Sequence, residues 1–338
     1  NPVLFNNHTS YYKEVKEHFF PFRKDSIVNS VENAVKHLDL LMFSKTKQYY
    51  SRNGTLSMGY NYEFDIYNFI NTTHNSNQLA INKDGTVTFN PFYNLTGRKF
   101  SKSDSFFIRQ LNEFIEKTDF INFFKDHDSL YKAVKLNYDR FVDMNTIWNW
   151  SEKRFEKLTD SYTTTISLLC GSKFNARFSY KYTFDNFTEL QLFNTTPYIY
   201  PNMTEKEIIA NNTVPVYTLQ GRQYLYKLFQ GYNSRKFSGF TNIKKWYFDN
   251  NIQKSDNLSP FAIFYEYLDW VITTDFIRNN YEKKMSVKWI DRIHDVAASQ
   301  GFLKIREFDA EFQRLINQSK DKKIASVIDE LYNWCIKQ

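Results

Sequence analysis

The feature that most constrains the fold is the recurrence of apolar side chains at helical spacing along most of the chain. Within residues 104–117, for example, Phe107, Leu111 and Phe114 fall on one face of a helix. Only 9 of the 338 residues are glycine, whereas folds built from many short strands need numerous glycine-rich turns. Both features predict a predominantly helical chain with a sizeable apolar core.

The same periodicity places the individual helices. One of them has a clear start signal, because Ser259 can cap it and Pro260 occupies its first position. The pattern predicts helices over residues 10–20, 26–44, 61–70, 104–117, 119–125, 127–143, 145–158, 205–210, 216–232, 241–250, 260–279, 286–299, 307–317 and 323–336.

Three segments read as strands instead. A turn signal at residues 84–85 precedes the alternating residues 86–89, and residues 162–170 form a β-branched run. Residues 176–184 alternate between aromatic and polar side chains, as a half-exposed strand at a sheet edge does. Asp185 or Asn186 can then cap a further helix that runs to about Asn194, before Pro197. We therefore expect an α+β fold, predominantly helical, with one small mixed sheet.

The domain organisation follows from the same pattern. Residues 1–200 hold the first helices and the sheet, and residues 201–338 hold a helical C-terminal part. Glycine- or proline-rich linkers and internal repeats are not found in the sequence. We expect the two parts to form one compact unit.

Charge and composition exclude several classes of function. The net charge is +7, but lysine and arginine are interleaved with acidic residues and form no run typical of nucleic-acid binding. No segment approaches the roughly 18–20 apolar residues that span a bilayer. Cys170 ends an apolar run and reads as a small buried residue. Its pairing with Cys335 is left open by the sequence.

The chain resembles an uncharacterised family of bacterial exported proteins, a domain of unknown function with a zincin-like signature. The resemblance covers most of the chain and continues through the strand that ends at Cys170 to the segment that begins at Phe187. It is carried by residues 11–15, 19–22, 111–115, 120–124 and 127–141. It implies a zincin-like fold, in which the sheet is followed by the helix that holds the metal.

The most specific motif of the family is a helical His-Glu-x-x-His, in which the histidines bind zinc and the glutamate activates water. A proline follows five residues after the second histidine, and here Pro197 lies five residues beyond Leu192. In that register Thr188 and Leu192 occupy the two ligand positions, and Glu189 occupies the position of the general base.

The resemblance also implies a third ligand, a carboxylate from a later helix. Glu266 is the candidate here, with Asp269 as an alternative one turn on. A partly exposed glutamate in an ion pair would look the same in the sequence. Since Leu192 offers no donor atom and threonine is a poor zinc ligand, we expect no metal, no cofactor and no catalytic residue.

These considerations predict a catalytically inactive metallopeptidase homologue. It would bind a peptide or protein in the cleft between the helices of Glu189 and Glu266, beside the edge strand 176–184. One alternative is an active metal-dependent hydrolase that recruits a distant histidine to Glu189 and Glu266. A second alternative is a structural exported protein that acts through an interface.

The start at Asn1, together with the resemblance, predicts export, with the signal segment outside this sequence. We expect neither nucleic acid nor a transmembrane segment, and the sequence leaves the oligomeric state open.

Overall fold

The computed structural model describes residues 9–33, 79–90, 102–156, 158–169, 176–181, 187–199, 201–229, 243–248 and 259–338. At residues 102–104, 176–181 and 219 only the backbone is described. The predicted helix 61–70, residues 34–44 of the second predicted helix, and Cys170 lie outside the described residues. Within the described residues the fold is α+β and mostly helical, as predicted.

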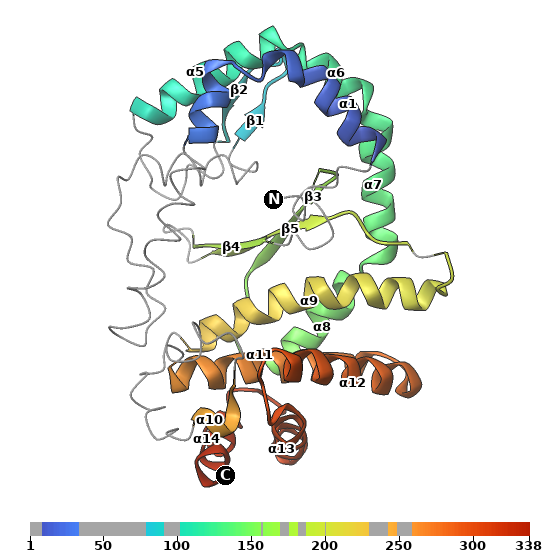
Figure 1. Ribbon diagram of the computed structural model, residues 1–338, viewed down its shortest axis with the longest axis vertical. Coiled ribbons are helices and arrows are strands. Elements are labelled where there is room, and N and C mark those ends of the chain that lie inside the picture. The colour runs from blue at the N-terminus through green and yellow to red at the C-terminus, as the bar shows by residue number, and fades with distance from the viewer. Residues whose placement is uncertain are drawn as a thin grey trace.

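The first part of the chain forms a layer of helices and one small hairpin (Figure 1). Residues 26–33 are also helical and follow the turn at residues 23–25. The layer contains α1 (Ser10–Phe19), η1 (Phe20–Phe22), β1 (Leu79–Ile81), β2 (Val87–Phe89), α5 (Lys102–Lys117), α6 (Phe120–Asp126) and the start of α7 (Asp128–Phe141).

The hairpin is antiparallel, and its first strand was not predicted from the sequence. Its turn holds Gly85 at a φ of 86°, a conformation that glycine adopts without strain. The side chain of Asn112 on α5 then clamps the second strand, because its Oδ1 accepts from the Val87 amide at 2.6 Å and its Nδ2 donates to the Val87 carbonyl at 2.9 Å.

A three-stranded mixed sheet lies between this layer and the C-terminal helices (Figure 1). It consists of β3 (Ser161–Ser167), β4 (Ala176–Lys181) and β5 (Thr188–Thr195), in the order β3-β5-β4. The central strand β5 is parallel to β3 and antiparallel to β4. Strands β3 and β4 agree with the prediction, but residues 87–89 belong to the separate hairpin and the central strand β5 was not predicted. Within the described residues β4 ends this sheet.

The prediction of a helix after the sheet is wrong, because residues 188–195 form the central strand itself. The segment alternates: Leu190 and Leu192 belong to the apolar core, and Glu189 and Gln191 stand at the intervening positions. Pairing with a strand on either side satisfies the backbone of this segment across the sheet. The alternation of every second residue therefore describes this segment better than the helix that its cap residue and Pro197 had suggested.

The C-terminal part is a helical assembly (Figure 1). Its helices are α8 (Met144–Arg154), α9 (Glu205–Phe229), α10 (Ile243–Trp246), α11 (Pro260–Asn280), α12 (Lys283–Ser299), α13 (Ile305–Gln318) and α14 (Ile328–Lys337). The helix α9 was predicted as two helices, yet it continues through Pro215, which is exposed. That proline removes one backbone donor but leaves the helix intact.

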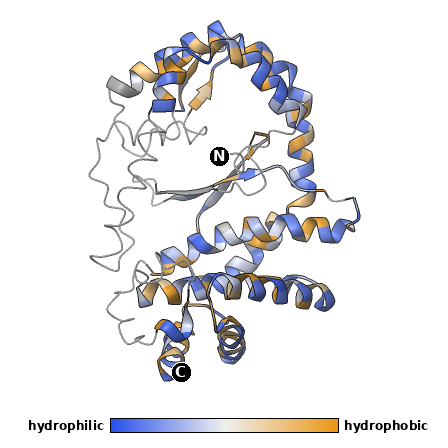
Figure 2. Ribbon diagram, in the orientation of Figure 1, coloured by the Kyte–Doolittle hydropathy of each residue, from blue (hydrophilic) through white to orange (hydrophobic). Residues whose placement is uncertain are grey.

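The helix α11 is the centre of this assembly. The Ser259 hydroxyl caps it, as predicted, by accepting from the Ala262 amide at 3.1 Å. Its residues are buried on nearly every side, because α9, α12 and α13 all pack against it. Figure 2 shows apolar and hydrophilic residues interspersed along the outer helices such as α12, which bury only one face.

The apolar core draws on residues from both sides of position 200. Trp150 of α8 and Leu190 of β5 share it with Tyr217 of α9 and Phe276 of α11. Tyr217 and Phe276 stack with ring centroids 4.0 Å apart, and the Trp150 ring meets the Tyr217 ring edge-on at 5.0 Å. Cys335 is a free, buried thiol. Of the helices described, none is long and apolar enough to cross a bilayer.

Candidate functional site

Thr188 and Leu192, at the predicted metal-ligand positions, stabilise the sheet and its packing. Leu192 is fully buried in the apolar core, so its side chain can neither bind nor position a metal. Thr188 donates to Asp160 twice, from its amide at 2.6 Å and from its hydroxyl at 2.9 Å. These two hydrogen bonds lower the pKa of Asp160 and fasten the start of β5 to the residue before β3.

Glu189, the predicted general base, is a buried side chain of the central strand, only 4% exposed. The Gln191 side chain donates to its Oε1 at 2.8 Å. Two residues apart on a strand, these side chains share one face of the sheet, and Leu190 and Leu192 occupy the other. The structure therefore contradicts the helix on which the degenerate zincin motif was placed.

Glu266, the predicted third ligand, belongs to an ion pair between helices. Both of its carboxylate oxygens lie within 2.6 Å of Arg222 Nη2 on α9. The Nε of the same guanidinium lies 3.0 Å from Asp269, the alternative ligand. Burial would lower the pKa of Arg222, but the charges of Asp269 and Glu266 outweigh it and raise that pKa. The ion-pair interpretation of Glu266 is thus confirmed, and this clamp joins α9 to α11.

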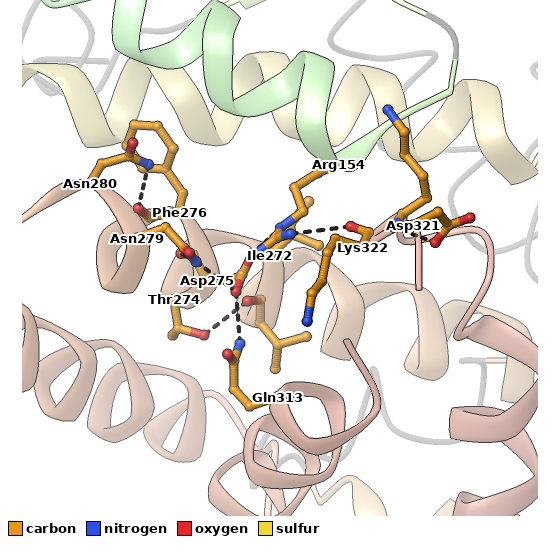
Figure 3. Close-up of polar contacts among 12 residues, drawn as sticks. Arg154, Ile272, Thr274, Asp275, Phe276, Asn279, Asn280, Gln313, Asp321 and Lys322 are labelled. Atoms are coloured by element: carbon orange, nitrogen blue, oxygen red, sulfur yellow. Dashed lines mark hydrogen bonds and ion pairs between the residues drawn. The ribbon is translucent and has the colours of Figure 1, made fainter. Parts of the chain in front are cut away.

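A deeply buried ion pair lies elsewhere, between α8 and α11 (Figure 3). Arg154 Nε donates to Asp275 Oδ2 at 2.7 Å, and Arg154 Nη1 reaches the Lys322 carbonyl at 3.2 Å. The other oxygen of Asp275 accepts from Asn279 and from Gln313, each at 3.0 Å. The protein's own groups satisfy the Asp275 carboxylate, so this network stabilises helix packing and does not serve as a ligand site. In the part of the chain that the structure describes, no group of three His, Cys, Asp or Glu side chains could hold a metal ion.

An open depression of about 500 Å³ lies where β3 meets the end of α7, the start of α8 and the first half of α9. Its size falls within the range of about 300–1,000 Å³ typical of small-ligand sites. One wall is the face of β3 that carries Tyr162, Thr164 and Ile166. The helical side of the lining contains Tyr138, Val142, Met144 and Ile209.

One residue of this lining, Tyr138, brings a buried polar group to the depression. Tyr138 is buried, and its hydroxyl accepts from Asn194 Nδ2 at 2.9 Å. Burial raises the pKa of Tyr138 to about 12, so the phenol stays neutral at physiological pH. A neutral phenol can donate or accept a hydrogen bond but is a poor general acid or base near neutral pH.

The charged residues around the rim are already paired or engaged. Lys135 bonds to Asp139 at 2.5 Å on α7, and Arg140 bonds to Glu205 at the start of α9 at 2.8 Å. Asp143 caps α8 by accepting from the Thr146 amide at 2.9 Å. Positive and negative groups on the rim therefore balance, and the depression offers apolar walls with a few neutral hydrogen-bonding groups.

The sequence contained signals for the separate walls of this depression but not for their meeting. Tyr162, Thr164 and Ile166 share one face of a strand because they are two residues apart, and Asp143 is a recognisable helix cap. The depression exists because β3 pairs with β5, which was read as a helix.

A scan against protein-family models and searches of curated proteins and of solved structures found no match to this chain.

Proposed function

We propose that this chain is a non-catalytic binding protein, and that the depression beside β3 takes a segment of a peptide or of another protein. The proposal keeps the binding function expected from the sequence and moves it to a different place. The predicted cleft between Glu189 and Glu266 is not the binding site, because Glu189 lies on a buried strand and Glu266 is held by Arg222.

The chemistry of the lining supports a peptide-like ligand. A peptide presents uncharged amides and apolar side chains together, and the lining pairs neutral groups such as Tyr138 and Thr164 with apolar ones such as Ile166 and Met144. Balanced rim charges favour neither a strongly acidic nor a strongly basic ligand. Export stays a prediction.

The single observation that carries the proposal is the combination of a sizeable depression with a buried polar residue, Tyr138, in its lining and a second, Asn194, bonded behind it. Asn194 is 3% exposed and its Oδ1 has no hydrogen-bond partner among the described residues, next to the Tyr138 hydroxyl. Buried polar atoms are nearly always satisfied by protein or by ordered water. Water that bonds to polar groups in the lining of a depression can be exchanged for the amide groups of a ligand.

The test uses two matched variants of α8. Asn145 is an exposed residue of the depression's rim, and Asn149 is an exposed residue one turn further along the same helix, outside the lining. Peptides from a random displayed library are selected on the unaltered protein, and their affinities are measured by titration. Asn145→Trp should weaken binding by about tenfold or more, because the indole fills the entrance, whereas Asn149→Trp should leave it unchanged.

The fluorescence of Trp148 gives an internal signal for the same titration, since its ring lies 5.7 Å from that of Tyr162, which lines the depression. Occupation of the depression should change the fluorescence of this tryptophan. Equal affinities for the Asn145→Trp and Asn149→Trp variants, or failure of the library to give any binder, would refute the proposed site. Recovery of cleaved peptides would refute the absence of catalysis.

A further inference from the structure

The helix α1 is attached to α5, α6 and α7 mainly through rings and a few polar contacts. None of its residues is fully buried. Tyr11 meets Tyr131 edge-on at 5.9 Å, with the two hydroxyls 2.9 Å apart, and Phe19 meets Phe123 at 5.3 Å. A helix held by so few buried groups is closer to local release than one inside the core.

His127, between α6 and α7, is at the centre of this attachment. Its Nδ1 lies 2.7 Å from the Phe123 carbonyl oxygen, and its Nε2 lies 2.8 Å from Glu14 Oε2 on α1. The edge of the Tyr11 ring packs against the imidazole, with centroids 5.2 Å apart. The side chain of His127 is 14% exposed and that of Glu14 is 50% exposed, so water reaches the Glu14 contact more easily than the Phe123 contact.

Both groups that face the imidazole are acceptors. A carbonyl oxygen has no hydrogen to give, and the Glu14 carboxylate has none when ionised. Two hydrogen bonds therefore require a hydrogen on each ring nitrogen, which only the imidazolium cation carries. Neutral His127 must lose either the bond to Phe123 or the bond to Glu14. The second loss would remove the Glu14 contact and leave α1 with the Tyr11–Tyr131 hydroxyl pair and the contact of His18 with the Thr118 carbonyl as polar links.

We propose that α1 is a pH-dependent latch, closed while His127 is doubly protonated and loosened when that imidazole loses a proton. Such loosening would uncover the Phe123 and Tyr131 rings on α6 and α7. The chain beyond α1 stays fixed, because Asp25 pairs with Lys117 of α5 at 3.1 Å and Ile27 is buried.

The charged groups around His127 favour its cationic form. Glu14 faces it from α1 and Asp126 from the end of α6, and the hydroxyls of Tyr11 and Tyr131 are the neutral neighbours. The Phe123 carbonyl and then the Glu14 carboxylate raise the pKa of His127, outweighing the effect of burial. The latch is therefore fully closed below the ordinary histidine pKa of about 6.5. It loosens as the pH rises through the raised pKa of the folded state.

The test exploits the location of the tryptophans. All six lie between residues 148 and 334, so none reports on α1. In a Phe19→Trp protein labelled with 5-fluorotryptophan, the added 19F resonance reports whether α1 is docked. This resonance should move toward the position of a solvated indole as the pH rises from about 5 to 9, across the histidine range, while circular dichroism shows the rest of the fold intact.

Two matched substitutions on α1 assign the transition. Glu14→Gln should shift its midpoint to lower pH, because the carboxylate that stabilises the cation is gone. Glu17→Gln, an exposed residue on the same helix, should leave the midpoint unchanged. His127→Gln should abolish the transition. A resonance that does not move with pH, or equal shifts for the Glu14→Gln and Glu17→Gln proteins, would overturn the proposal.

Discussion

Substitution of Asp275 by asparagine should be among the most destabilising conservative changes in this chain. The carboxylate is fully buried and lies 2.7 Å from Arg154 Nε, whose side chain is only 11% exposed. Asparagine keeps the shape and can still bond to Asn279 and Gln313, but it leaves the buried guanidinium without a counter-ion. Breaking a buried ion pair by removing one partner typically costs about 3–5 kcal/mol.

The structure places the expected loss toward the lower end of that range. Arg154 keeps the Lys322 carbonyl at 3.2 Å, and its guanidinium lies 5.8 Å from the centre of the Trp150 ring. With a loss of about 3 kcal/mol and a urea dependence near 3 kcal/mol per molar, the midpoint of unfolding should fall by about 1 M. Urea titration followed by tryptophan fluorescence measures this directly.

A matched substitution and a double variant separate charge burial from side-chain loss. Asp291→Asn removes the carboxylate of a pair with Arg306 in which both side chains are more than half exposed, and should change stability by well under 1 kcal/mol. Arg154→Met combined with Asp275→Leu should recover most of the loss, since an apolar pair leaves no buried charge. Equal midpoints for Asp275→Asn and Asp291→Asn would refute the reasoning, as would a double variant less stable than Asp275→Asn.

Two further predictions concern backbone strain and acid stability. Gly301→Ala should lower stability by roughly 1–3 kcal/mol, because Gly301 has a φ of 98° and an added Cβ would lie 2.3 Å from the Phe248 carbonyl oxygen. The exposed Ser299→Ala change two residues away should leave the melting temperature almost unaffected. Burial would raise the pKa of Asp309, but hydrogen bonds from His294 and Arg278 and the Arg278 charge outweigh it, so that this pKa is lowered. Its contribution is present above the ordinary aspartate pKa of about 3.9 and is lost as the pH falls through the folded-state value. Urea midpoints measured at decreasing pH should therefore fall less steeply in Asp309→Asn than in the unaltered protein, and identical slopes would contradict this.

Most helices could be predicted from the sequence because their signals are local. The apolar spacing in α5 and α13 and the Ser259 cap of α11 act within a few residues of one another. The exception among the described helices is α9, which was divided at Pro215. Proline excludes one intrahelical hydrogen bond, but packing against α8 and α11 holds the helix together on both sides of it.

The candidate site was not predictable in the same way. The alternation of Leu190 and Leu192 with Glu189 and Gln191 was present in the sequence, but a cap and a proline at suitable distances suggested a helix instead. A segment of eight residues is too short for its periodicity to decide between the two forms. The family resemblance then placed a metal motif on the wrong element, and Glu266 was assigned to a site when it serves an ion pair.

The sequence by itself determined that this protein is mostly helical, carries some β structure and has an apolar core, because repeated side-chain spacing decides which faces can leave water. Tertiary structure alone decided that residues 188–195 lie at the centre of the sheet and that β3 and Tyr138 line one depression. Strand pairing joins residues far apart in the chain, such as Ser161 with Glu189. No local pattern encodes such a pairing, since its free energy comes from partners that only the folded chain brings together.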